Sequence, residues 1–171
     1  SAGTAAQIVQ SGGKTWYFIT VDIAFGMALE RNATAVIAAN GCRVLGAVRY
    51  PVGNADYSSM LLQAQASKAE VIGLASVGND LVNLVKQAGE FGIGSGGQKL
   101  AALLIYITDV HSLGLKAAQG LILTSPFYWD QNDATRAWSR RFIERRKMVP
   151  TMVQASSYGA VTHYPRPWRP L

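Results

Sequence analysis

Cysteine and histidine are scarce in this 171-residue sequence, which has one cysteine and two histidines. A single cysteine excludes an internal disulfide and any metal site built from several cysteines. The two histidines, His111 and His163, lie far apart and belong to no cluster with metal-ligand spacing. The sequence therefore indicates no metal and no other cofactor.

Long apolar runs are lacking as well. The longest, at residues 100–107, falls far short of the roughly 20 residues that span a bilayer, and residues 121–123 form only a short run. Residues 1–11 lack the basic start and apolar stretch of a secretory signal peptide. We therefore expect either a cytoplasmic chain or a mature or truncated piece of an exported protein.

Charged residues make up only 15% of the chain, against 49% hydrophobic residues, which excludes wholesale disorder. The net charge of +6 comes from the C-terminal part, since residues 136–171 carry eight Lys or Arg and one Asp or Glu. A basic stripe on a helix can bind phosphate. No nucleic-acid-binding motif accompanies it, so we expect a solvated helix face and no nucleic-acid partner.

Short apolar runs alternate with helical patterns along most of the chain. The predicted strands are residues 15–20, 43–50, 71–75, 100–105 and 120–124. The predicted helices are residues 25–40, 56–67, 80–91, 112–118, 132–147 and 151–164. This alternation predicts the α/β class, with an open, doubly wound parallel sheet of about five strands and helices on both faces. We expect a single α/β lobe over residues 1–164 and an irregular, proline-rich tail over residues 165–171.

Ligands in such sheets bind beyond the carboxyl ends of the strands. This rule selects the segments 20–26, 51–59, 75–80, 106–111 and 125–130, several of which mix aromatic and polar residues as a small-molecule site does. Asp22, Asp56, Asp80 and Asp109 lie at these strand ends. They could form an acid–base pair or cap helices, and both interpretations stay open.

Motifs of catalysis and cofactor binding are not found. The letters GxGxxG occur at residues 92–97, but there they follow a helix and precede a strand, the reverse of the dinucleotide-binding order. Gln98 stands where a phosphate-binding loop needs glycine before lysine, and no GxSxG elbow is present. The sequence therefore predicts a protein that is not an enzyme.

Four stretches together resemble a known family. They are TWYFITVDIAFG at 15–26, RYPVGNADYSSMLLQAQ at 49–65, SKAEVIGLASVGND at 67–80, and residues 107–130. In this order and spacing they are similar to type I periplasmic solute-binding proteins, and more closely to the branched-chain amino-acid receptor class of ABC importers. The resemblance extends over residues 3–164. It implies the second of two lobes only, without the first lobe or the segment that returns to it.

The resemblance also implies site residues. In the family, the aromatic residue before the glycine of the first motif faces the ligand, which here is Phe25. The loop after the third strand lines the cleft, which nominates Ser76 and Asn79. For Phe25 the structural alternative is a core aromatic residue at the start of a helix.

Further positions follow from the same resemblance. Thr108 and Asp109 stand where amino-acid receptors place a carboxylate that pairs with the ligand's ammonium, although Asp109 could instead cap a helix beginning at Ser112. Tyr57 and the 127–129 segment, with Tyr128, add an aromatic wall or pack in the core. The DIAFG and FYWD variants resemble a subgroup linked to aromatic acids.

The expected function is therefore ligand binding in an interlobe cleft, with an amino acid or aromatic carboxylate as ligand, an ABC permease as partner of the intact protein, and a periplasmic location. An isolated lobe should bind its ligand weakly, and its exposed cleft face favours a homodimer. Three alternatives remain: a ligand-sensing lobe of a regulator, an enzyme of the doubly wound class, and a degenerate or truncated fragment without independent activity.

Overall fold

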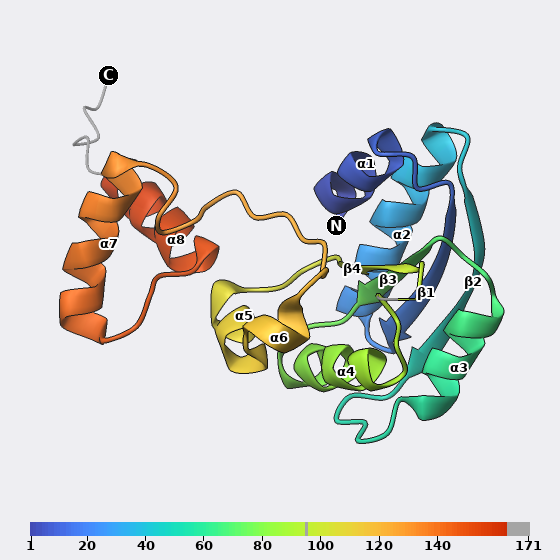
Figure 1. Ribbon diagram of the computed structural model, residues 1–171. Coiled ribbons are helices and arrows are strands. Elements are labelled where there is room, and N and C mark those ends of the chain that lie inside the picture. The colour runs from blue at the N-terminus through green and yellow to red at the C-terminus, as the bar shows by residue number, and fades with distance from the viewer. Residues whose placement is uncertain (95, 164–171) are drawn as a thin grey trace. The chain divides into compact units, whose positions relative to one another are not determined.

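The computed structural model describes residues 1–94 and 96–163 of the chain (Figure 1). The tail predicted at residues 165–171 lies outside the described residues. Four parallel strands form one sheet in the order β2-β1-β3-β4. They are β1 (Thr15–Val21), β2 (Arg43–Tyr50), β3 (Val71–Ala75) and β4 (Lys99–Ala102). The predicted α/β class with a parallel sheet is confirmed.

Helices cover both faces of this sheet (Figure 1). On one face, α1 (Ala2–Gln10) and α2 (Ala24–Ala39) pack on Trp16 and Phe18 of β1. On the other face, α3 (Ser58–Ala66) and α4 (Gly78–Glu90) pack on Ile19 and Val21. Adjacent residues of β1 thus enter opposite cores, because side chains alternate along a strand. Each such side chain, when fully buried, contributes roughly 1.5–3 kcal/mol, which explains the near-continuous apolar run of β1.

The fifth predicted strand, at residues 120–124, is reduced to a single parallel bridge between Ala101 and Ile122. Two hydrogen bonds hold it: the Ala102 N–H donates to the Ile122 carbonyl and the Ile122 N–H to the Leu100 carbonyl, both at 2.9 Å. β4 itself ends at Ala102, short of the predicted Ile105. The sequence shows that the segment is apolar. The neighbouring strand β4 is short, however, so few of its backbone groups are available to pair with the segment.

Two helical regions differ from the sequence prediction. The sequence pattern predicted no helix before residue 15, yet α1 forms there and buries the small residues Thr4 and Ala5 together with Ile8. The helix predicted at residues 112–118 begins earlier and is broken in two, as α5 (Ile107–Leu113) and α6 (Leu115–Ala118). Gly114 separates them with a φ of 79°, a left-handed conformation that glycine adopts without strain.

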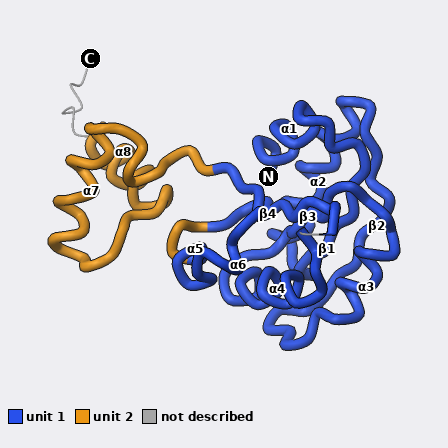
Figure 2. Tube along the Cα trace, in the orientation of Figure 1, with its two compact units in different colours: residues 1–105, 109–124 blue, residues 106–108, 125–171 orange. Residues whose placement is uncertain are grey.

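The chain divides into two compact units, coloured in Figure 2. Unit 1 comprises residues 1–105 and 109–124 and holds the sheet. Unit 2 comprises residues 106–108 and 125–171, of which the part described includes α7 (Asp133–Arg146) and α8 (Met152–His163). In unit 2, Trp138 contacts the rings of Phe127, Phe142 and Tyr158 at centroid distances of 5.4–5.7 Å. That residues 1–164 act as one lobe stays a prediction.

Candidate functional site

The four parallel strands end on one side of the sheet, at Val21, Tyr50, Ala75 and Ala102. Ligands in open α/β sheets bind just beyond such ends. We call the segments 22–26, 51–57 and 76–80 the carboxyl edge; all three belong to unit 1. The carboxyl edge is therefore the first place to look for a binding site.

Phe25 lies in the first turn of α2 at this edge, and 43% of its surface is exposed. The next residue, Gly26, lies against the end of β1: a Cβ there would stand 2.2 Å from the Val21 carbonyl oxygen. No larger residue fits that contact, so α2 starts directly on the strand. Phe25 is thereby held outward beside Ile23 and Met27, which are also partly exposed.

A partly buried hydrogen bond ties α2 to β1. The Thr20 hydroxyl, fully buried on β1, donates to the Glu30 carboxylate of α2 at 2.6 Å. The Arg49 guanidinium lies 3.7 Å from the same carboxylate and is half exposed, so it adds little. Thr20 and Glu30 thus anchor the helix that carries Phe25, a role that the sequence pattern did not indicate.

Ser76 and Tyr57, both nominated from the sequence, are fully buried. The Ser76 hydroxyl accepts a hydrogen bond from the Tyr50 hydroxyl at 2.5 Å, and the rings of Tyr50 and Tyr57 meet edge to face at 5.0 Å. Burial raises the pKa of Tyr50 to about 12 and also raises the pKa of Tyr57, so both phenols are neutral at ordinary pH. These side chains support the loops after β2 and β3 from beneath and have no exposed surface of their own.

Asn79, by contrast, lines an open pocket of about 470 Å³ between these two loops. The pocket is lined by Val52, Gly53, Asn54, Ala55, Val77, Asn79, Asp80 and Asn83. The Gly53 N–H donates to the Asp80 carboxylate at 3.0 Å, which ties the loop after β2 to the start of α4. The pocket therefore offers three carboxamides and one carboxylate to a polar ligand.

Sequence reasoning missed two of those carboxamides, Asn54 and Asn83. Asn83 lies four residues after Asn79, so both project from one face of α4. That spacing could have nominated Asn83 once Asn79 was chosen. Asn54 carried no comparable signal, because its position depends on the path of the loop after β2.

Thr108 and Asp109 lie in the first turn of α5, and both are half-buried. The expected helix start at Ser112 was wrong, since Ile107, Val110 and Leu113 already give the apolar spacing of a helix from residue 107. Asp109 is therefore inside a helix rather than before one, where its negative charge favours the helix N-terminus. Thr108 belongs to unit 2 and Asp109 to unit 1.

Tyr128 belongs to unit 2, where 45% of its surface is exposed and its ring lies 5.8 Å from that of Trp129. The Trp129 Nε1 is buried without a hydrogen-bond partner among the described residues.

Within residues 1–94 and 96–163, no group of three or more His, Cys, Asp or Glu residues could hold a metal ion. Across the same residues, no helix combines the length and hydrophobicity needed to cross a membrane.

An α/β lobe with an exposed aromatic ring and a polar pocket at its carboxyl edge is the kind of structure found in solute-binding proteins. Residues 1–166 match the family described as periplasmic binding protein, and the chain belongs to that family. The resemblance drawn from the motifs is thereby confirmed. Family membership implies a periplasmic location.

Solved structures agree with this assignment. A periplasmic binding protein from Burkholderia mallei is 52% identical, with a TM-score of 0.88 over 95% of this chain and 43% of that chain. A branched-chain amino acid ABC transporter periplasmic ligand-binding protein from Burkholderia xenovorans is 37% identical, with a TM-score of 0.84 over 95% of this chain and 45% of that chain. The relatives are solute-binding receptors of ABC transporters and not enzymes.

A more distant structure shares the fold alone. It is an ABC transporter solute-binding protein from R. palustris in complex with 4-hydroxybenzoate, 23% identical, with a TM-score of 0.63 over 67% of this chain and 32% of that chain. No curated protein sequence matches the chain. The chain spans less than half the length of the three structures described.

Proposed function

We propose that this chain is a ligand-binding lobe of an extracytoplasmic solute receptor for an ABC importer, and that its ligand is an amino acid or an aromatic carboxylate. The observation that supports this most is that the carboxyl edge of a periplasmic binding protein fold carries both an exposed Phe25 ring and a polar pocket at Asn79, although Phe25 is not among the residues that line that pocket. An apolar surface beside a few polar groups is what small-molecule recognition requires.

Phe25 and Asn79 have complementary roles in this proposal. The Phe25 ring packs on the apolar or aromatic part of the ligand. The Asn79 amide donates a hydrogen bond to the ligand carboxylate. Ser76 and Tyr57 act through Tyr50, because the buried contacts of Tyr50 hold the two loops that shape the pocket.

Asp109 distinguishes the two ligand classes. A carboxylate at Asp109 pairs with the ammonium group of an amino acid and gains nothing from benzoate, which has no amine. Asp109 therefore gives a direct test of the ligand class. A role for Tyr128, which lies in unit 2, stays a prediction from the resemblance.

Transport follows from binding without chemistry on the ligand. In the intact receptor a second lobe supplies the remaining contacts, and closure of the two lobes buries the ligand. The closed receptor then docks on a membrane permease. A micromolar ligand has a binding free energy of about −8 kcal/mol, and half the contacts leave about −4 kcal/mol, so this chain alone binds at about millimolar concentration.

A titration of the chain followed by amide NMR tests the proposal, with leucine, benzoate and 4-hydroxybenzoate as ligands. One of them should shift the amides of the carboxyl edge, and Phe25→Ala and Asn79→Ala should each weaken that binding about fivefold or more. Leu62→Ala is the matched control, since Leu62 is exposed on α3 outside the carboxyl edge. Asp109→Asn should weaken leucine binding and leave benzoate unaffected.

Two results would contradict the proposal. If none of the three ligands shifts an amide of the carboxyl edge even at saturating concentration, the proposed site is wrong. A micromolar isotherm that Phe25→Ala does not change would place binding elsewhere in the chain.

A further inference from the structure

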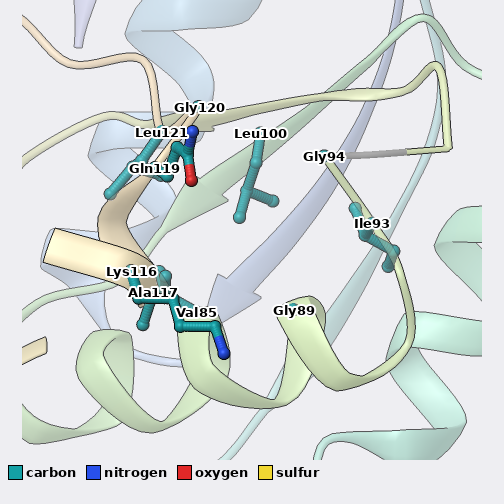
Figure 3. A pocket seen from close by; sticks show the side chains of 10 residues that line it. All are labelled: Val85, Gly89, Ile93, Gly94, Leu100, Lys116, Ala117, Gln119, Gly120 and Leu121. Atoms are coloured by element: carbon teal, nitrogen blue, oxygen red, sulfur yellow. The ribbon is translucent and has the colours of Figure 1, made fainter. Parts of the chain in front are cut away.

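A second cavity, of about 550 Å³, lies away from the carboxyl edge, against the amino-terminal half of β4 (Figure 3). Its walls come from the second half of α4 and the turn after it, from β4, and from the segment that contains α6. All of its lining residues belong to unit 1. Neither the motifs nor the family assignment explains this cavity.

The floor of the cavity is aliphatic. Val85, Ile93 and Leu100 line it although no more than 6% of the surface of any of them is exposed, and the half-buried Leu121 completes the floor. Among the described residues that line the cavity, none is aromatic and none is acidic. The cavity therefore suits a branched or straight alkyl group and has no surface for ring stacking.

Lys116 and Gln119 bring polar groups to the same cavity. Both come from the stretch that begins after Gly114, and Figure 3 shows their side chains at the cavity, the Lys116 chain running beside Val85. Among the described residues, Lys116 takes part in no salt bridge. The aliphatic floor fits the alkyl chain of a carboxylic acid, and the Lys116 ammonium and the Gln119 carboxamide can bind its carboxylate.

Gly89 supplies an independent observation. It lies in the last turn of α4 with an ordinary helical backbone, and a Cβ there would meet nothing within 4 Å. Neither backbone conformation nor close packing requires glycine at this position, and glycine weakens a helix relative to alanine. Because Gly89 has no side chain, this wall of the cavity stays open (Figure 3).

We propose that this cavity is a second ligand site, which binds a small aliphatic monocarboxylate with its alkyl chain on Val85, Ile93 and Leu100 and its carboxylate at Lys116 and Gln119. An amino acid is disfavoured, because none of the described residues that line the cavity is acidic and able to pair with an ammonium group. The site takes a different ligand from the carboxyl edge and does not depend on the function proposed for that edge.

Hexanoate is the probe, with hexylamine and leucine for comparison, in an amide NMR titration of the whole chain. Hexanoate should shift the amides of Gly89, Lys116 and Leu121 in a saturable manner. Hexylamine, whose charge is repelled by Lys116, and leucine should leave these amides unmoved. Saturable shifts from hexylamine equal to those from hexanoate, or no shift from hexanoate at millimolar concentration, would overturn the proposal.

Three variants define the site. Lys116→Ala should weaken hexanoate binding about tenfold, and Gly89→Leu should abolish it by extending a side chain over the cavity. Lys86→Ala removes an exposed lysine of α4 that does not line the cavity and should change nothing. If Lys86→Ala weakens binding as much as Lys116→Ala does, the effect is general electrostatics and the site is wrong.

Phe25→Ala separates this proposal from the one for the carboxyl edge. It should leave hexanoate binding intact while it weakens the ligand of that edge. Loss of hexanoate binding in Phe25→Ala would mean that the two ligands share one site, which overturns the second site and leaves the first.

Discussion

The Tyr50 hydroxyl is the residue-scale feature that most directly supports the carboxyl edge, because it bonds Ser76 in a fully buried position. Tyr50→Phe removes the donor and leaves the Ser76 oxygen buried without it. We expect the free energy of unfolding to fall by about 1–2 kcal/mol, measured by urea denaturation. Tyr158→Phe, at a partly exposed ring, is the control and should change it by less than about 0.5 kcal/mol. If Tyr50→Phe and Tyr158→Phe change the free energy of unfolding equally, the hydrogen bond from Tyr50 to Ser76 makes no contribution of its own to stability.

The Tyr50 phenol also makes the stability of the fold depend on pH in the alkaline range. Burial raises the pKa of Tyr50 from 10.0 to about 12, so the folded state favours the neutral phenol more than the unfolded state does. This contribution is complete below pH 10 and is lost as the pH rises towards 12. Denaturation midpoints should therefore fall across that range, with a shallower fall in Tyr50→Phe. An identical slope in the variant would contradict the assignment to Tyr50.

Gly26 and Gly89 form a matched pair of helical glycines. A Cβ at Gly26 would stand 2.2 Å from the Val21 carbonyl oxygen, whereas a Cβ at Gly89 meets nothing within 4 Å. Gly26→Ala should therefore destabilise the chain by roughly 3 kcal/mol, since backbone must move. Gly89→Ala should be neutral or stabilise by up to about 1 kcal/mol. Thermal and urea unfolding of both variants measure this, and a tolerated Gly26→Ala would show that α2 does not start tightly on β1.

At the scale of elements, the N-terminal cap of α7 can be tested directly. The sequence predicts a helix over residues 132–147, and in the structure the Asn132 side chain accepts a hydrogen bond from the Thr135 N–H while Thr135 Oγ1 accepts one from the Asn132 N–H. Asn132→Ala should cost about 1 kcal/mol and speed amide hydrogen exchange in the first turn of α7. Gln131→Ala, one residue outside the cap, should leave exchange unchanged. Unaltered exchange in Asn132→Ala would contradict the capping role.

Elements with a strong periodic pattern were the ones that the sequence predicted well. β1, β2 and β3 end at or within one residue of their predicted ends, and α2 within one residue, because each has a run of apolar residues at the spacing of its element and a glycine or proline nearby. α1 was missed because its buried face is made of Thr4, Ala5 and Ile8, which give little apolar signal. The fifth strand failed for the opposite reason: its residues are apolar, but whether they pair depends on the length of β4.

At the scale of the whole molecule, the position of the carboxyl edge was predictable from the sequence. Which of its side chains are exposed and which are buried was not. The rule of strand ends selected the segments 20–26 and 75–80, which lie at the edge and contain Phe25 and Asn79. It could not separate them from Ser76 and Tyr57, which lie beneath it. Their burial depends on Tyr50, and Tyr50 meets Ser76 because β2 and β3 both flank β1. A contact between strands that are not neighbours in the sheet leaves no local trace in the sequence.

Self-association is the property of the whole chain that its surface predicts. Ile23, Phe25 and Met27 are each at least 36% exposed at the start of α2, and clustered apolar surface promotes association. We expect a homodimer whose population rises with concentration in sedimentation velocity and rises further in sulfate, which strengthens apolar contacts. Phe25→Ser should shift the chain towards monomer. Leu115→Ser, at a leucine 86% exposed on α6, is the control and should not. A chain that stays monomeric at every concentration, or a dimer that Leu115→Ser disrupts as strongly as Phe25→Ser does, would show that the carboxyl edge is not the associating surface.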